Sequence, residues 1–394
     1  MSAPTQLLGQ LTGVGADPVR GGCSRHVFDR AETELRTWFV EQAERRDLRV
    51  ETDCNANLWA WWGDPGPHAV VTGSHLDSVP GGGAFDGPLG VVSALSAVDA
   101  WRARGHAPRR PFAIAVFAEE EGGRFGVPCL GSRLLTGAID PDRARALRDP
   151  DGVTFAEAMG AAGLRPELAG RDGTTLGRIG QFVELHVEQG RALEQPIGVA
   201  SSVLAHGRWR FRFHGQGNHA GTTAIDDRRD PMLPAAEFVL AARRAAEAEP
   251  GARATVGKLT PTPASTNAIP SRVDLWLDAR SPQRLRPMVD DLAATAEELA
   301  AQHGCSVDVR QDSASGHVRF HPQLRDQLAT ELHAPLLETG AGHDAGQLAD
   351  HVPSGMLFVR NPTGVSHAPD EHAEPDDCAA GATALADVLA RLTR

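Results

Sequence analysis

Residues 68–87 read HAVVTGSHLDSVPGGGAFDG. The first six residues form a short, mostly apolar run of the kind that makes a buried strand, and His75 follows where this strand ends. In α/β proteins, ligands bind beyond the carboxyl ends of the strands. The three glycines at 81–83 allow the loop to fold tightly around a small ion. The stretch therefore predicts an α/β sheet with an ion site at a strand end, although a turn with a capping aspartate and a solvated histidine fits the same residues.

Two aspartates accompany His75. Asp86 lies at the far end of the glycine loop, where a second ligand is expected. Asp77 lies two residues beyond His75, and a carboxylate at that spacing can orient the imidazole through a hydrogen bond. The stretch thus supplies a candidate pair of ligands and a group that supports one of them.

Strands and helices alternate around this stretch. Apolar, strand-like runs occupy residues 58–62, 69–73 and 112–118, and helical periodicity marks residues 27–46 and 90–101. Continuous apolar strands that alternate with helices predict a mostly parallel sheet covered by helices.

The middle of the chain has a different pattern. Residues 208–213, RWRFRF, alternate polar and apolar side chains, as a half-solvated strand does. The order of the elements that follow completes a β-α-β-β-α-β unit, which is typical of ferredoxin-like domains. We expect strands at 254–259, 273–279 and 307–310 and helices at 235–248 and 285–303.

The α/β pattern then returns, with a strand at 356–359 and a helix at 378–392. This tail is too short to form a core of its own. We therefore expect one α/β domain, made of residues 1–205 and 315–394, that is interrupted by a ferredoxin-like α+β domain at 206–314.

The composition restricts the class of protein. The 394 residues carry a formal net charge of −12 and no basic block, which argues against nucleic acid or an anionic membrane as a partner. No apolar run is long enough to span a membrane, and the N-terminus lacks a secretory pattern. The five cysteines are scattered without a CxxC pair, so we expect a cytoplasmic protein with neither a thiolate zinc site nor a disulfide framework.

Three further strand ends carry histidine or carboxylate. Glu119–Glu121 follow the strand at 112–118, and adjacent carboxylates repel one another unless a cation is present. His186 lies in the apolar run FVELHVEQG, and His367 follows MLFV. Alone, these fit a solvated acidic turn, a core histidine and a loop histidine. Four such positions together predict a site for zinc, manganese or cobalt with imidazole and carboxylate ligands.

Seven motifs in order carry a family resemblance: GSHLDSVPGGGAFDGPLG, EEEGGRFG with GSRLLTG, ELHVEQG, NHAGTT, TNAIPSRVDLWLDAR, GHDA and GVSHAP. The set resembles the N-carbamoyl-L-amino-acid hydrolase and allantoate amidohydrolase family. These are dinuclear-metal amidohydrolases, a branch of the aminoacylase and carboxypeptidase-type metallopeptidases. The resemblance runs from about residue 20 to the C-terminus.

The resemblance implies two divalent metal ions per subunit, zinc or manganese, with cobalt or nickel as alternatives. Asp86 would bridge the two ions. His75 and His186 would complete one site, and Glu121 and His367 would complete the other.

The resemblance also implies roles for residues outside the metal ligands. Glu120 would be the general base. His219 would stabilise the oxyanion, in relatives from the partner subunit, although a turn histidine fits its motif as well. Asn267 and Arg280 would hold the substrate carboxylate, although Arg280 at a strand end also fits a surface ion pair. Gln189 lies close to His186 in sequence, so we expect it to contact the ureido end of the substrate. The roles of His343 and Asp344 stay open, and the insert would be a lid and dimerisation domain.

We therefore expect a homodimeric metalloenzyme that hydrolyses the ureido or amidine C–N bond of a small carboxylate substrate. Allantoate is the first candidate and an N-carbamoyl-L-amino acid is the second. A dipeptidase or aminoacylase, or a catalytically silent metal-binding protein, are more distant alternatives.

Overall fold

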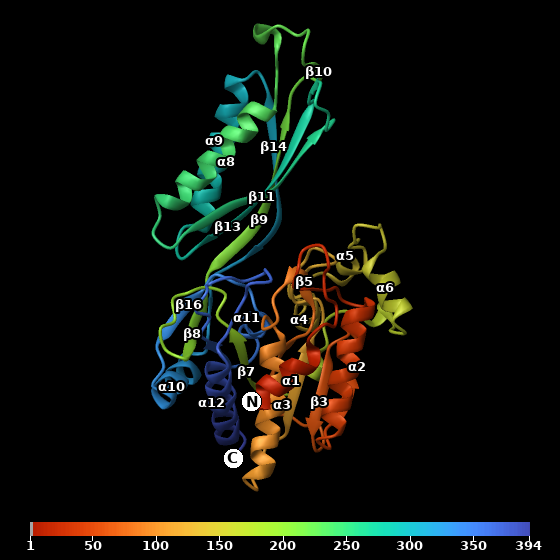
Figure 1. Ribbon diagram of the computed structural model, residues 1–394, viewed down its shortest axis with the longest axis vertical. Helices are drawn as coiled ribbons and strands as arrows, with labels where there is room; N and C mark the ends of the chain where they lie inside the picture. The colour runs from red at the N-terminus through yellow and green to blue at the C-terminus, as the bar shows by residue number, and fades with distance from the viewer. Residues whose placement is uncertain (1–2) are drawn as a thin grey trace. The chain divides into compact units, whose positions relative to one another are not determined.

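The computed structural model describes residues 3–394, which form two compact units (Figure 1). The first unit contains the chain up to Val203 together with Arg319–Arg394, and the second unit is Leu204–Val318. The predicted insert, 206–314, lies within the second unit. Among the described residues, no helix has both the length and the apolar character needed to cross a bilayer.

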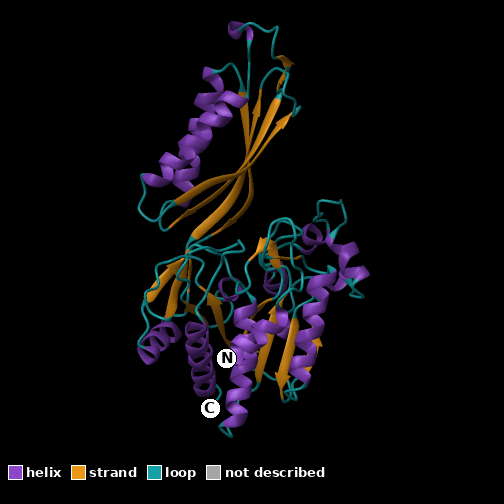
Figure 2. Ribbon diagram, in the orientation of Figure 1, coloured by secondary structure: helices purple, strands orange, loops and turns teal. Residues whose placement is uncertain are grey.

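The first unit is built around a mixed nine-stranded sheet (Figure 2). Its four central strands are parallel and almost wholly buried, and in order they are β17 (Ser354–Val359), β7 (Ile179–Val187), β4 (Ala69–His75) and β6 (Phe112–Phe117). The outer strands are β8 (Ile197–Val203), β15 (Val318–Arg319) and β16 (Leu336–Thr339) on one side and β3 (Leu58–Trp62) and β2 (Arg49–Thr52) on the other. The predicted α/β fold with a mostly parallel sheet is confirmed. A separate ribbon pairs β1 (Cys23–Arg25) with β5 (Ser78–Gly82).

The helices of the first unit lie on this sheet or beside it. They are α1 (Ala3–Leu11), α2 (Arg30–Glu44), α3 (Pro88–Ala103), α4 (Leu130–Thr136), α5 (Pro141–Arg145), α6 (Phe155–Ala161), α7 (Gly173–Leu176), α10 (Pro322–Leu332), α11 (Asp344–Leu348) and α12 (Pro375–Leu392). Helices α3 and α12 pack on each other and against the central strands, where Leu185 and Val187 of β7 join their core. Side chains alternate along a strand, so Glu184 and His186 point to the opposite face. There α11 contacts β7, and the Ala345 amide donates to the Glu184 carboxylate over 3.0 Å.

The second unit is a four-stranded antiparallel sheet with two helices. The strands lie in the order β11 (Arg253–Thr262), β13 (Arg272–Ser281), β9 (Ala205–His214) and β14 (Ser306–Ser315). Helices α8 (Met232–Glu247) and α9 (Leu285–Gln302) pack on the sheet around Phe211, Phe213 and Phe238 (Figure 2). This is the β-α-β-β-α-β arrangement that the sequence predicted. Two short strands, β10 (Asn218–His219) and β12 (Ala268–Ile269), pair in a ribbon outside the main sheet.

Candidate metal centre and active site

The four parallel strands bring the predicted ligands to one edge of the sheet. In the strand register, His75 of β4 lies opposite Phe117 of β6, and His186 of β7 lies opposite Phe358 of β17. The carboxyl ends of parallel strands meet at the same edge. Side chains that are far apart in the sequence, from His75 to His367, therefore meet at this edge of the sheet.

The first group of side chains is His75, Asp86 and His186, all buried. His75 Nδ1 donates to the carbonyl of Asp77 over 3.0 Å, and His186 Nδ1 donates to the carbonyl of Val187 over 2.8 Å. Because a carbonyl only accepts, each Nδ1 carries the proton and each Nε2 keeps its lone pair. The two Nε2 atoms lie 3.5 and 3.2 Å from Asp86 Oδ1 and have no hydrogen-bond partner among the described residues. Two oriented lone pairs and a carboxylate oxygen fit a metal ion.

The second group is Asp86, Glu121 and His367. Asp86 Oδ2 lies 3.6 Å from His367 Nε2, which lies 3.3 Å from Glu121 Oε2. The two oxygens of Asp86 thus face different groups, as expected of a carboxylate shared by two ions. The His367 side chain is 47% exposed, whereas those of Asp86 and Glu121 are 5% exposed. His367 therefore lies at the open side of the centre.

Glu120 belongs to neither group but lies beside them. Its Oε2 is 3.7 Å from His75 Nε2, and its Oε1 accepts a hydrogen bond from the Cys129 thiol over 3.3 Å. Glu119 points elsewhere, because its Oε1 accepts from the amides of Arg124 and Phe125. The three adjacent glutamates thus have three different environments.

The carboxylates of the centre are crowded in a buried space. Burial raises the pKa of Glu120 to about 7. Burial, with Asp86 and Glu120 close by, raises the pKa of Glu121 well above its usual value. A divalent cation offsets both the free-energy cost of burying such charged groups and their mutual repulsion. The electrostatics therefore agree with the donor set.

Asp77 supports both histidine and glutamates. Its carbonyl, rather than its carboxylate, orients His75, since Asp77 Oδ1 is 3.7 Å from His75 Nδ1. Its two carboxylate oxygens accept from the amides of Glu120 and Glu121 over 3.2 and 3.1 Å. Asp77 thus ties the end of β4 to the turn after β6.

Glu371 was absent from the sequence prediction. Its Oε1 accepts from the amides of Phe85 and Asp86, each over 2.9 Å, and the residue is only 5% exposed. A β-carbon at Gly83 would lie 2.4 Å from the Glu371 side chain, so this position of the glycine loop has no room for one. Glu371 follows His367 by four residues, and it joins the segment that carries this histidine to the loop that carries Asp86. Nothing in the local sequence distinguishes it from the acidic residues around it.

A further group joins Glu184 and His343 to His186. The His343 ring packs on the His186 ring with centroids 4.6 Å apart, and Glu184 accepts from Ser74 Oγ and the Ala345 amide. His186 Nδ1 is bonded to the Val187 carbonyl, and His186 Nε2 faces Asp86. His186 therefore has no nitrogen left for a separate ion, so Glu184 and His343 support the first metal site. His343, whose role the sequence left open, thus packs against the candidate metal ligand His186.

Gln189 lies at the metal centre. Its Nε2 donates to Asp86 Oδ2 over 2.7 Å and lies 3.2 Å from His367 Nε2. Its Oε1 is buried without a hydrogen-bond partner among residues 3–394. An acceptor in this position can bind an N–H group of a substrate.

The second unit brings His219 and Asn267 together. His219 pairs with Ala268 across the β10–β12 ribbon, and the Ala220 amide donates to the Asn267 carbonyl over 3.0 Å. The Gly221 amide donates to His219 Nδ1 over 3.0 Å, so the ring proton lies on Nε2. The exposed ring therefore presents Nε2 as a donor.

Arg280 lies at the other end of this unit. It pairs with His206 near the start of β9 and bonds Asp278 through Nε over 3.0 Å. Eight residues of extended strand separate Arg280 from Arg272, which corresponds to about 26 Å. Figure 1 shows β10 at the end of the unit remote from the start of β9. One copy of the second unit thus keeps His219 and Arg280 apart.

The model of Peptidase family M20/M25/M40 matches residues 71–391 of this chain. The chain belongs to the M20 peptidase family. Within it, the chain groups with the hydantoinase/carbamoylase amidases, so it is a metal-dependent amidohydrolase whose two ligand groups fit the dinuclear metal site of the family.

Its relatives include enzymes with different substrates. It is 35% identical to the N-carbamoyl-L-amino acid amidohydrolase of Geobacillus stearothermophilus, over 96% of this chain and 95% of the relative. It is 31% identical to the allantoate amidohydrolase of Escherichia coli strain K12, over 97% and 95% of the two chains. It is 33% identical to the ureidoglycolate hydrolase of Arabidopsis thaliana, over 94% and 82%. The crystal structure of AtUAH in complex with glyoxylate aligns with a TM-score of 0.90 at 29% identity, over 100% of this chain and 98% of that one.

The shared carboxylate predicts different metal losses for two ligand variants. Asp86→Ala should lose activity and most bound metal, because Asp86 contributes an oxygen to each group. His367→Ala should keep about one ion, since the first group stays intact. Metal content measured by mass spectrometry after dialysis checks this, with His351→Ala as an exposed-histidine control. Near-normal metal content and turnover in Asp86→Ala would contradict a shared ligand.

Proposed function

We propose that this protein hydrolyses the terminal ureido group of a small carboxylate substrate and releases ammonia, carbon dioxide and an amine. Allantoate is the first candidate and an N-carbamoyl-L-amino acid is the second. The observation that carries the proposal is the pair of ligand groups that share Asp86, with Glu120 beside them and outside both. The named activities of the relatives support this substrate class.

Two zinc or manganese ions held by the two groups would lower the pKa of a water molecule and polarise the scissile carbonyl. Glu120 takes a proton from the attacking water and returns it to the leaving nitrogen. Burial raises the pKa of Glu120, which favours a group that both accepts and donates a proton. The Cys129 hydrogen bond on Oε1 keeps Oε2 on the side of His75.

Residues of both units are proposed to hold the substrate. Gln189 offers its buried carbonyl oxygen to the ureido N–H groups. Asn267 and Arg280 hold the carboxylate, and the guanidinium fork of arginine suits a carboxylate well. His219 donates from Nε2 to the oxyanion that forms on the carbonyl.

We also propose that the protein is a homodimer and that the insert carries the dimer contact and closes the site. The support is a distance within one unit. Along β13 alone, Arg272 and Arg280 are about 26 Å apart. His219 pairs with Ala268, which precedes Arg272 in the chain, so this span of strand, longer than a small substrate, lies between the β10–β12 ribbon and Arg280. If both contact one substrate molecule, they come from two copies of the chain. We also propose a cytoplasmic location, and the free thiols of the five cysteines support it.

A panel of substrates tests the reaction. The protein reconstituted with manganese or zinc is offered allantoate, N-carbamoyl-L-amino acids, N-acetyl amino acids and dipeptides, and ammonia and amine are both measured. Ammonia release from the ureido substrates supports the proposal. Amine release without ammonia assigns a dipeptidase or aminoacylase. Metal binding without turnover of any substrate assigns a silent binding protein.

The adjacent glutamates should give separable variants. Glu120→Gln keeps the shape of the side chain and removes the base, so metal should stay bound while kcat falls by about 10²–10⁴. Glu121→Gln should weaken metal binding, because Glu121 is a ligand. Metal content and kcat of the two purified variants check this, and exchanged phenotypes would contradict the assignment of the two residues.

The dimer should show complementation between two inactive variants. His219→Ala should lower kcat by about 10²–10³ through loss of an oxyanion donor, and Glu120→Gln removes the base. If His219 serves the partner's site, mixed dimers contain one site with both residues intact. Activity should therefore return when the two variants are mixed and re-associated. Verified heterodimers that are folded and metal-loaded but inactive would show that His219 acts within its own chain or not at all.

A further inference from the structure

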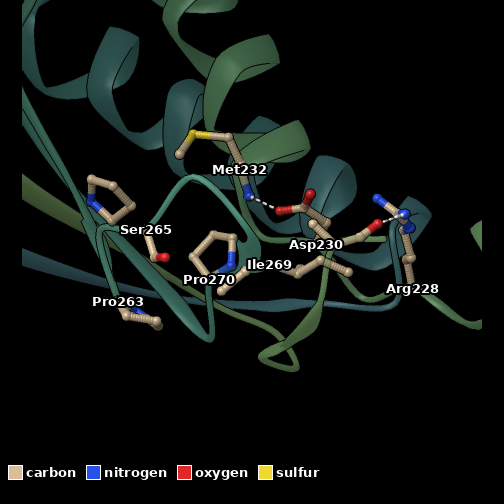
Figure 3. Close-up of a pocket in the computed structure, with 10 residues that line it drawn as sticks. Arg228, Asp230, Met232, Pro263, Ser265, Ile269 and Pro270 are labelled. Carbon is tan, nitrogen blue, oxygen red and sulfur yellow. Dashed lines mark hydrogen bonds between the residues drawn. The ribbon is translucent and has the colours of Figure 1, made fainter. Parts of the chain in front are cut away.

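Arg228 holds the backbone of the loop that presents His219. Its Nη2 donates to the carbonyl of Ala220 over 2.7 Å and to that of Thr223 over 3.1 Å, and its Nε donates to the Thr223 carbonyl over 3.2 Å. Figure 3 shows the bond to Ala220 as the dashed line at Arg228. One guanidinium thus fastens two points of a five-residue loop.

The loop itself is a short turn around His219. The Thr223 hydroxyl donates to the His219 carbonyl over 2.7 Å, and the Gly221 amide donates to His219 Nδ1. These bonds occupy the carbonyl of His219 and fix the ring. Arg228 donates to two other carbonyls of the turn, those of Ala220 and Thr223, so its hydrogen bonds add to those that shape the turn.

The surroundings of Arg228 leave its bonds to the Ala220 and Thr223 carbonyls as its main polar contacts. Arg228 lines a pocket of about 250 Å³ in the second unit, between Pro261, Pro263, Ser265, Ile269 and Pro270 and the start of α8 (Figure 3). The nearby Asp230 is engaged with the Met232 amide over 2.9 Å. Within the part of the chain that the structure describes, the Arg228 guanidinium forms hydrogen bonds with backbone carbonyls alone.

We propose that Arg228 is a positioning residue for His219 and fixes the turn that directs Nε2–H at the reacting carbonyl. This inference rests on the oxyanion role proposed for His219. A planar guanidinium spans two carbonyls, whereas a lysine ammonium is a single point charge on a flexible stem, so lysine cannot replace it. A donor displaced by about 1 Å loses most of its effect on the transition state, and such shifts cost up to about 10² in rate.

Arg228→Met and Arg228→Lys test the inference, with Arg229→Met as the matched control. Arg229 is the next residue, and its side chain is exposed and forms no hydrogen bond with residues 219–223. Both Arg228 variants should lower kcat by about 10–10² with little change in KM. Metal content should not change, because the metal ligands lie outside the second unit. The Arg229 variant should match the original protein.

A double-mutant cycle distinguishes positioning from general damage. In the His219→Ala background, Arg228→Met should lower kcat by less than about twofold further, because the group it positions is gone. Equal and independent losses in both backgrounds would overturn the inference and leave the role of His219 standing. A His219→Ala variant with normal kcat would overturn the oxyanion role and, with it, this inference.

Hydrogen exchange gives a readout that does not depend on turnover. Amides in the peptide spanning residues 219–223 should exchange about tenfold faster in Arg228→Met than in Arg229→Met, with unchanged exchange in α8 and β13. Unchanged exchange in the loop would overturn the inference even if the substrate panel gave no active compound. Faster exchange with no ureido hydrolysis would instead place the failure in the proposed function.

Discussion

A single buried carboxylate, Asp86, determines how the candidate metal centre is built. One of its oxygens faces the Nε2 atoms of His75 and His186, and the other faces His367 and Gln189. A buried charge is tolerated only with such compensation. The compensating groups come from segments nearly 300 residues apart in sequence, so the register of the parallel sheet has to be right for the centre to exist. The chemistry of the site is therefore a property of the whole sheet.

The glycine-rich loop serves this carboxylate. Gly87 has φ of 83°, and a β-carbon there would lie 2.5 Å from the ring of His75. Gly83 leaves the space that Glu371 occupies while its carboxylate accepts the amides of Phe85 and Asp86. Glycine is thus required at positions 83 and 87 because a carboxylate and an imidazole, respectively, pack directly against the backbone there. His75 and Glu371 hold the loop in place, so contacts within the protein orient Asp86.

The sequence predicted the parts of the structure that local patterns encode. The strands at 58–62 and 112–118 were found within one residue of β3 and β6, because fully buried strands are continuous apolar runs. Strand β8 was missed, since its GVASSV segment mixes small and polar residues. The short helices between 130 and 176 were missed because four to seven residues are too few to show a helical period.

The same limit applies to the site. His75, Asp86, His186, His367 and the run Glu119–Glu121 could be proposed because each lies at or near the end of a recognisable strand or loop motif. The family resemblance then singled out Glu121 within its run. Glu371 and Arg228 could not be proposed, because their roles depend on hydrogen bonds to backbone atoms, which leave no pattern in the side chains around them. Asp77 shows the intermediate case, in which the residue was found but its carbonyl, and not the predicted carboxylate, orients His75, while the carboxylate accepts from backbone amides. Side-chain chemistry is readable from sequence, whereas a bond to a carbonyl or an amide requires the fold.

The antiparallel sheet of the second unit fixes a distance, just as the parallel sheet of the first unit fixes a register. Strand β13 pairs along its whole length with β9, so Arg280 cannot approach the β10–β12 ribbon without breaking that ladder. The turn that carries His219 is held independently by Arg228 and by the pairing of β10 with β12. His219 and Arg280, the two groups proposed to contact one small substrate, are thus kept apart in each chain. The length of this sheet is therefore the physical argument for the homodimer proposed above.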